Sequence, residues 1–191
     1  QQPHQRPGRR ADDDLEEDER PDKDLVLARS VGEKVTAAEL RKRYDYRLAE
    51  TSGRRRHLQV IGRGAFGRVV SARSKEFNQD VAMKIVSSTV MSAESLLREV
   101  EVLRRVRGHD HVIHLLEVLE CDGEWYLVTE LCEGGDLLDR LIANGPYDED
   151  TAARVFLHTA SAVNHVHRCG YAHGDIKPEN IAFVTKGGTR R

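Results

Sequence analysis

The sequence predicts an α+β fold in which a sheet comes first along the chain and helices come second. Short apolar runs rich in β-branched residues, separated by turn residues, occupy residues 58–131. After residue 135 the apolar residues recur at spacings of three and four, which is the period of one helix face. Because strands and helices are segregated along the chain, we expect two lobes.

Composition excludes several classes of protein. The 191 residues include 30 Lys and Arg against 32 Asp and Glu, a net charge of −2, and 39% are hydrophobic. This balance gives no overall basic field for nucleic acid, and no apolar run approaches the roughly 18 residues of a membrane-spanning helix. The three cysteines form no C-x-x-C pair, and no secretory signal is visible. We therefore expect a cytoplasmic or nuclear protein with neither nucleic acid nor a membrane span among its partners.

The chain is predicted to divide into three parts. Residues 1–24 are rich in acidic side chains and almost devoid of apolar ones, so they cannot bury enough surface to offset the entropy of ordering. We expect residues 1–50 to be a disordered acidic tail and linker, with a short helix over 37–46. Residues 51–131 form the predicted sheet lobe, and residues 132–191 the predicted helical lobe.

Five strands and three helices account for the two lobes. The five strands are expected over 58–61, 69–72, 81–86, 112–119 and 125–131. Asp122-Gly123 between the last two is a strong hairpin signal. One helix, over 92–107, interrupts the strands because apolar residues recur there at helical spacing. Two further helices, over 136–143 and 149–168, are each followed by a glycine where helices often end.

A glycine string, Gly62-Arg63-Gly64-Ala65-Phe66-Gly67, is the first candidate for chemistry. Glycines let a backbone bend tightly and bring its N–H groups close to phosphate oxygens. The same spacing occurs in dinucleotide sites, but those require a helix directly after the glycines, whereas a strand is predicted here. No G-K-[ST] follows, which excludes a Walker loop. A phosphate-covering turn and a plain flexible hairpin both remain open.

The second candidate is Lys84, which lies in a predicted strand. Alone it would be an ordinary solvated lysine. Glu99, however, borders the apolar stripe of the predicted helix, because it is one turn from both Leu96 and Leu103. A charge at that position needs a partner, and Lys84 is the natural one. A lysine fixed by such a carboxylate would become a positioned phosphate clamp.

The third candidate is the stretch from His173 to Asn180, which follows the long predicted helix. Asp175 could accept a hydroxyl proton, Lys177 could neutralise a transferring phosphoryl group, and Asn180 could ligate a magnesium ion. The spacing H-x-D-x-K-x-x-N is far more specific than a glycine string. These residue types indicate phosphoryl transfer.

With these three motifs in this order, the chain resembles the eukaryotic protein kinases from about residue 58 to residue 184. Lys177, within Asp-x-Lys-Pro-Glu-Asn, resembles the serine/threonine class. The stretch from Glu130 to Leu137 is similar to the calcium-dependent and calmodulin-regulated kinases, although no EF-hand loop is present. The resemblance implies transfer of the ATP γ-phosphate to Ser or Thr hydroxyls of a protein substrate, with ATP and Mg²⁺ as cofactors.

The resemblance also implies a role for each matching residue. Asp175 would be the catalytic base, with Lys177 beside it, and Asn180 a magnesium ligand. The glycine-rich turn that covers the phosphates would comprise Ile61, Gly62, Arg63, Gly64, Ala65, Phe66, Gly67 and Arg68. Val69 and Ala82 would pack on adenine, and Lys84, anchored by Glu99, would contact the phosphates. Thr129 would be the gatekeeper, Glu130 and Cys132 the hinge that binds adenine, and Asp136 would lie near the ribose.

Two departures from the family pattern bear on activity. Gly174 stands where most of these kinases have an Arg that binds an activation-loop phosphate, so phosphorylation-dependent switching is not expected to use that residue. No Asp-Phe-Gly follows Asn180 within the 191 residues. We therefore expect a kinase fragment that is a poor enzyme by itself. The competing interpretation is a non-catalytic, pseudokinase-like module that binds nucleotide or a partner.

Histidines gather in two places outside these motifs. The run His109-x-His111-x-x-His114 lacks the added Cys or carboxylate spacing of a zinc site, so we expect loop histidines rather than metal ligands. His165 and His167 lie near the end of the long predicted helix. There we expect them to interact favourably with the negative end of the helix dipole.

Overall fold

The structure, a computed structural model, describes residues 32–46, 48–49, 57–64 and 67–185. The acidic tail predicted over residues 1–24 lies outside these residues, as do Ala65 and Phe66 at the tip of the glycine string. Among the described residues, no helix combines the length and apolar character needed to cross a membrane.

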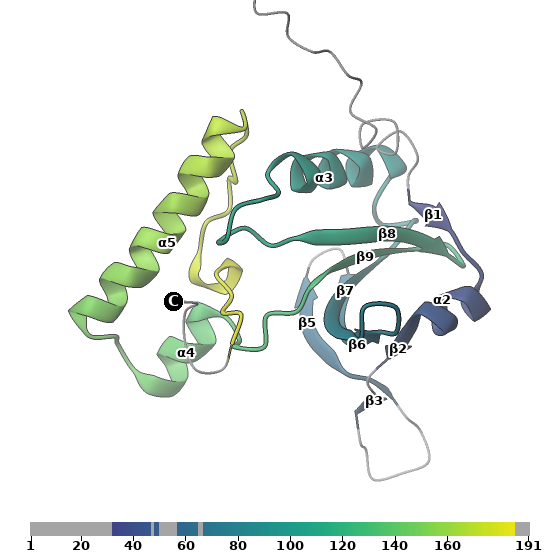
Figure 1. Ribbon diagram of the computed structural model, residues 1–191, viewed down its shortest axis with the longest axis horizontal. Helices are drawn as coiled ribbons and strands as arrows, with labels where there is room; N and C mark the ends of the chain where they lie inside the picture. Colours follow the sequence, from purple (N-terminus) through teal and green to yellow (C-terminus); the bar gives the residue numbers. More distant parts are fainter. Residues whose placement is uncertain (1–31, 47, 50–56, 65–66, 186–191) are drawn as a thin grey trace, which may run out of the picture.

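A sheet of seven strands forms the first lobe (Figure 1). Its order is β1-β8-β9-β7-β6-β2, and β5 pairs with the other half of β6. The strands are β1 (Glu33–Lys34), β2 (Tyr44–Tyr46), β5 (Val60–Gly64), β6 (Gly67–Ser74), β7 (Gln79–Ser87), β8 (Leu115–Cys121) and β9 (Glu124–Glu130), while β3 (Leu48–Ala49) and β4 (His57–Leu58) pair separately. The five predicted strands correspond to β5 to β9, and these strands pair antiparallel.

The turn between β8 and β9 shows why Asp122-Gly123 makes a tight hairpin. Both residues have positive φ, 49° at Asp122 and 76° at Gly123. A two-residue turn of this kind matches the right-handed twist of the flanking strands and requires residues that tolerate positive φ. The sequence therefore sets the register of β8 against β9, in which Cys121 faces Glu124.

Each face of the sheet has its own apolar core. Helix α3 (Ala93–Arg105) contributes Leu96 and Val100 to the core on one face, together with Val118, Trp125 and Leu127 of the sheet. Helix α2 (Ala37–Arg43) contributes Leu40 to the core on the other face, with Val70, Met83, Ile85 and Val128 among its strand residues. Strand alternation explains the division, because successive side chains point to opposite faces.

Residues 33–46 depart from the expected linker. β1 pairs in parallel with β8, and β2 pairs antiparallel with β6, so this segment closes parts of both sheet edges. Between them α2 is shorter than the predicted 37–46 helix, since Tyr44 is extended and begins β2. Thr36 and Glu39 form a capping box that starts the helix. The apolar residues Val35, Leu40 and Tyr44 are buried in the core, which is why the segment is part of the sheet lobe.

The second lobe is helical. The helices are α4 (Leu137–Asn144) and α5 (Glu149–Arg168). Asp136 caps the start of α4, where its carboxylate accepts a hydrogen bond from the Asp139 N–H. Asp148 caps α5 in the same way and accepts from the Thr151 N–H. A short turn η1 (Pro178–Asn180) follows. Figure 1 shows α4 and α5 to one side of the sheet. Neither helix contains a buried residue.

Candidate nucleotide and phosphoryl-transfer site

One face of the central strands gathers several of the predicted site residues. Lys84 lies opposite Val69 of β6 and Leu127 of β9, while Ala82 lies opposite Thr129. Directly opposed residues on neighbouring antiparallel strands point to the same face, as do residues two apart on one strand. Val69, Ala82, Lys84 and Thr129 therefore share the face on which α3 packs.

The predicted pairing of Lys84 with Glu99 is confirmed. Lys84 Nζ lies 2.5 Å from Glu99 Oε1, and each side chain is about one-third exposed, at 34% and 32%. Glu99 can reach the strand because the next residue of α3, Val100, and Leu96 are buried against the sheet. The lysine is thus held in one place by a carboxylate on a packed helix, while about one-third of its side chain remains exposed.

The glycine string forms a hairpin between β5 and β6, so a strand follows the third glycine. The dinucleotide alternative required a helix there and is wrong. A Cβ at residue 67 would lie 2.1 Å from the Ile85 carbonyl oxygen, so only glycine lets β6 approach β7 at this point. A Cβ at Gly64 would meet no atom within 4 Å. Close strand packing therefore requires Gly67 but not Gly64.

The segment after β9 is fixed by backbone pairing with the segment after Asn180. The N–H groups of Glu133 and Gly134 donate to the carbonyl oxygens of Val184 and Phe183, and the Leu137 N–H donates to Ile181. At the end of β9 the Glu130 N–H donates to the His114 carbonyl oxygen. The carboxylate of Asp136, predicted on the ribose side, accepts the Asp139 N–H at the start of α4.

Arg140 is a positioning residue that the sequence reasoning missed. Its Nε donates to the Gly134 carbonyl oxygen and its guanidinium nitrogen to the Thr185 carbonyl oxygen, each at 2.8 Å. The guanidinium carbon also lies 3.9 Å from the centre of the Phe183 ring. These partners are distant in sequence, so no local pattern around Arg140 pointed to this role. The contacts hold the residues after β9 against the segment that follows Asn180.

Asp175, Lys177 and Asn180 form a local hydrogen-bonded cluster. Lys177 Nζ lies 3.0 Å from Asp175 Oδ2, and Asn180 Nδ2 donates to that same oxygen at 2.9 Å and to the Asp175 carbonyl oxygen at 2.7 Å. The hydrogen bonds from Lys177 and then Asn180 hold the pKa of Asp175 below its usual value, and Asp175 raises the pKa of Lys177. Asp175 is therefore ionised at neutral pH.

Asn180 is the residue predicted to bind a metal ion. Its Nδ2 makes the two described hydrogen bonds, and its other amide atom, Oδ1, is an acceptor. Among residues 32–185 that the structure describes, no group of three or more His, Cys, Asp or Glu side chains is arranged to hold a metal ion.

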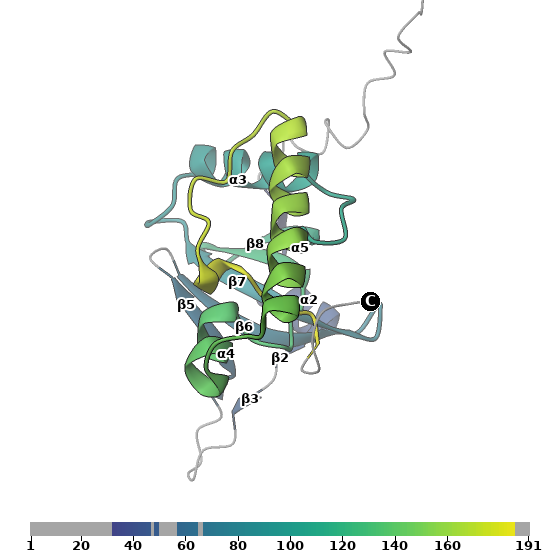
Figure 2. The same cartoon turned by 90° about the vertical axis from the view of Figure 1, so that its left-hand side faces the viewer.

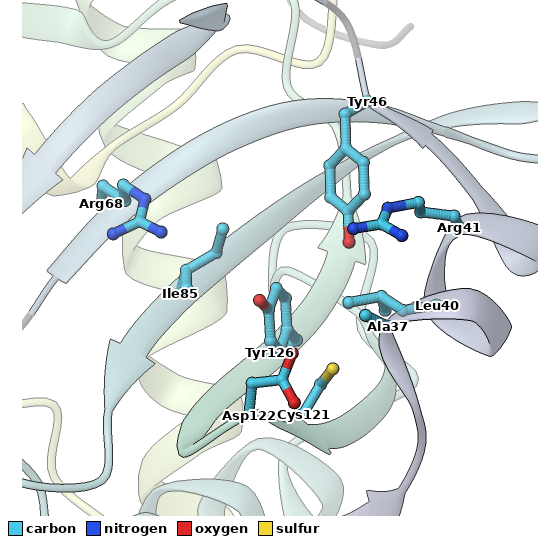
Figure 3. A pocket seen from close by; sticks show the side chains of 9 residues that line it. All are labelled: Ala37, Leu40, Arg41, Tyr46, Arg68, Ile85, Cys121, Asp122 and Tyr126. Carbon is cyan, nitrogen blue, oxygen red and sulfur yellow. The ribbon is translucent and has the colours of Figure 1, made fainter.

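A separate cavity of about 200 Å³ lies on the other face of the sheet, beneath α2. Figure 3 shows its lining side chains, among them Arg41, Tyr46, Ile85 and Tyr126. Ile85 neighbours Lys84 on β7 and so points to the opposite face. Burial raises the pKa of Tyr46 and of Tyr126, so both phenols are neutral. The cavity is therefore not part of the candidate nucleotide site.

Comparisons with known proteins agree with this geometry. A family model described as "Protein kinase domain" matches residues 55–190. CDPK-related kinase 1 from Arabidopsis thaliana is 39% identical over 137 residues, which are 68% of this chain and 24% of that protein. Serine/threonine-protein kinase H1 from Homo sapiens is 39% identical over 129 residues, covering 67% of this chain and 30% of that protein.

A solved structure shows the same fold. The crystal structure of Rad53 residues 1–466 in complex with AMP-PNP matches with a TM-score of 0.63 and 27% identity, covering 86% of this chain and 39% of that one. The chain spans about a quarter of the length of the plant kinases that it matches.

Proposed function

The chain belongs to the protein kinase family, and from that membership we propose that it carries the ATP-binding and proton-accepting part of a serine/threonine protein kinase. The whole protein would transfer the γ-phosphate of ATP to Ser or Thr hydroxyls of a protein substrate. The contact between Lys84 and Glu99 carries the proposal, because it fixes the ammonium group of a partly exposed lysine on the strand next to the glycine hairpin. Such a fixed cation is what a nucleotide phosphate requires.

ATP would be held by residues from the glycine hairpin, the strand face and the hinge. The hairpin part comprises Ile61, Gly62, Arg63, Gly64, Ala65, Phe66, Gly67 and Arg68. The Arg68 side chain lies opposite Ile85 and pairs with Glu124 on the other face of the sheet, so Arg68 would contribute only its backbone. The remaining residues are Val69 and Ala82 for adenine, Lys84 and Glu99 for the phosphates, Thr129, Glu130 and Cys132 at the hinge, and Asp136 near the ribose. The location of Val69, Ala82, Lys84 and Thr129 on one sheet face supports a single binding surface.

The transfer step would use the cluster around Asp175. Its ionised carboxylate would accept the hydrogen bond and then the proton of the substrate hydroxyl, as the low pKa allows at neutral pH. Lys177 would neutralise charge on the phosphoryl group. Asn180 would hold Mg²⁺ through Oδ1, and the ion would supply charge neutralisation at the phosphates when bound.

Nucleotide binding tests the first half of the proposal on the 191-residue chain. Titration calorimetry with AMP-PNP and Mg²⁺ would measure the affinity of the wild type, Lys84→Met and the control Lys75→Met. Lys75 is the matched control because it pairs with Asp45 at the far end of β6. We expect Lys84→Met to weaken binding at least about tenfold, the usual loss when a charged hydrogen bond is removed. Equal affinities for the wild type and Lys84→Met would contradict the proposal.

Phosphate transfer tests the second half on the whole protein. Incorporation of labelled phosphate from ATP into a Ser- and Thr-containing protein would be compared for the wild type, Asp175→Ala and the control Asp150→Ala. We expect Asp175→Ala to lower the rate more than about a hundredfold while AMP-PNP still binds. A wild type that binds nucleotide without transferring phosphate would instead identify the non-catalytic module.

A further inference from the structure

Four histidine rings meet between the segment that follows α3 and helix α5. His109 stacks on His165 with ring centres 4.9 Å apart and an angle of 26° between the planes. His111 stacks on His158 with ring centres 4.1 Å apart and an angle of 18°. His109 and His111 meet edge to face at 5.6 Å. The sequence predicted ordinary loop histidines here, because nothing local showed that α5 would bring two more rings to them.

Two polar contacts accompany the stacked rings. His109 Nε2 lies 3.1 Å from Ser161 Oγ, and His165 Nε2 lies 2.9 Å from the Val106 carbonyl oxygen. His165 therefore bonds to the end of α3 rather than simply facing its own helix dipole. Figures 1 and 2 show α5 as a separate rod beside the sheet, reached by the segment from α3 to β8. The histidines therefore lie where α5 meets the sheet lobe.

The surroundings of His111 favour its neutral form. Asp110 is the carboxylate that acts on His111, and it opposes the effects of burial, His158 and His109, which together lower the pKa of His111. Cys169 Sγ lies 3.8 Å from His165 Nε2, and Arg107 precedes the cluster in the chain. On α5, Arg154 lies one turn before His158 and donates to Thr151 Oγ1. Asp110 is therefore the carboxylate that opposes the lowered pKa of His111.

We propose that these four histidines form a pH-sensitive joint between the sheet lobe and α5. Neutral rings stack and hold the helix against the segment after α3. When both rings of a stacked pair take up protons from solvent, two positive charges lie face to face at about 4 to 5 Å and repel each other. The joint then opens as pH falls through the ordinary range of histidine, near 6.5.

The direction of the pH dependence follows from the lowered pKa of His111. A histidine that is harder to protonate in the closed state binds more protons when the joint is open. Closure is therefore favoured above the ordinary pKa of histidine and is progressively lost below it. A joint held by the attraction of protonated histidines to a helix C-terminus would show the opposite sign.

Hydrogen exchange of the 191-residue chain tests the joint. Exchange would be followed at about pH 7.5 and about pH 5.5, corrected for the intrinsic rate, with EDTA present so that no transition metal bridges the rings. We expect protection of residues 106–114 and 149–168 to fall at least about threefold at the lower pH, while β7 stays protected. Unchanged protection of both segments would overturn the proposal.

Two variants separate ring charge from ring packing. The double variant His111→Phe with His158→Phe keeps a stacked aromatic pair without titratable nitrogens, so the loss of protection at low pH should shrink by at least about half. His167→Phe is the control, because His167 is exposed on the same helix. A double variant with the full wild-type pH response would overturn the proposal.

An NMR titration provides a readout that does not depend on the double variant folding. In the single variant His158→Gln, the ring opposite His111 can no longer become positive. The titration midpoint of His111 should then rise toward that of an ordinary histidine. An unchanged His111 midpoint would overturn the joint.

Discussion

The two lobes differ in how they hold the residues of the candidate site. In the sheet lobe, Lys84 and Glu99 come from a strand and a helix that meet across a core containing Leu96 and Leu127, both almost fully buried. In the helical lobe, Asp175, Lys177 and Asn180 lie within six residues and bond to one another while remaining exposed. The first cluster depends on tertiary packing, whereas the second is made by local hydrogen bonds.

The same contrast extends to the elements themselves. The sheet carries a core on each face, while α4 and α5 contain no buried residue, and Phe156 and Leu157 of α5 are 71% and 63% exposed. A residue that buries little apolar area contributes little to the free energy of unfolding. The stability of the described chain therefore resides in the sheet lobe. Trp125, the single tryptophan, lies there and reports on that lobe alone.

The largest effect is expected from the core between α3 and the sheet. Leu96→Ala removes a fully buried side chain and leaves a cavity, so it should lower the free energy of unfolding by about 2 to 5 kcal/mol. Urea unfolding followed by Trp125 fluorescence measures this change. Leu157→Ala on α5 is the matched control and should change it by less than about 0.5 kcal/mol. Equal losses of unfolding free energy in the two variants would contradict the conclusion that stability resides in the sheet lobe.

The next largest effect is expected where β6 crosses β7. Gly67→Ala places a Cβ against the Ile85 carbonyl oxygen, and the forced backbone shift should cost about 1 to 3 kcal/mol. Gly64→Ala meets no neighbouring atom and should be close to neutral. Thermal unfolding followed by Trp125 fluorescence distinguishes the two. If Gly64→Ala were the more destabilising variant, the proposed reason for Gly67 would be wrong.

A smaller and localised effect is expected at the start of α5. Asp148→Ala removes the acceptor of the Thr151 N–H, so amides in the first turn of α5 should exchange about fivefold faster. Hydrogen exchange measures this rate, and the Trp125 unfolding transition should stay in place because α5 adds no buried residue. A shifted Trp125 transition would show that α5 stabilises the sheet lobe after all.

The smallest effect on stability is expected at the exposed Asp175 cluster. Lys177→Met removes the main cause of the low Asp175 pKa, so the carboxyl should titrate closer to the ordinary value near 3.9. The depressed pKa favours the ordered loop above that value, and this contribution is lost as pH falls through the folded pKa. Carbon-13 NMR of the carboxyl measures the midpoint. Lys177→Arg should keep the low pKa, and a Lys177→Met midpoint equal to the wild type would contradict the assignment.

The sequence predicted most elements because their signals are local. Apolar periodicity placed α3 and α5, and the predicted 149–168 helix matches α5 at both ends. Asp122-Gly123 predicted the β8–β9 turn, since few residue pairs tolerate two positive φ angles. Residues 33–46 were expected to be linker because β1 and β2 are too short to show a periodic pattern. Only pairing with β8 and β6 makes them strands.

The sequence alone was enough to identify the residue types that phosphoryl transfer needs, and their spacing along the chain. It did not identify their partners at long range, except where one charge on an apolar helix face required another, as Glu99 required Lys84. Tertiary structure decided that Arg140 reaches Thr185 and that four histidines from two segments stack in pairs. The physical reason is that hydrogen bonds and ring contacts act over a few ångströms in space, whereas sequence patterns record neighbours along the chain.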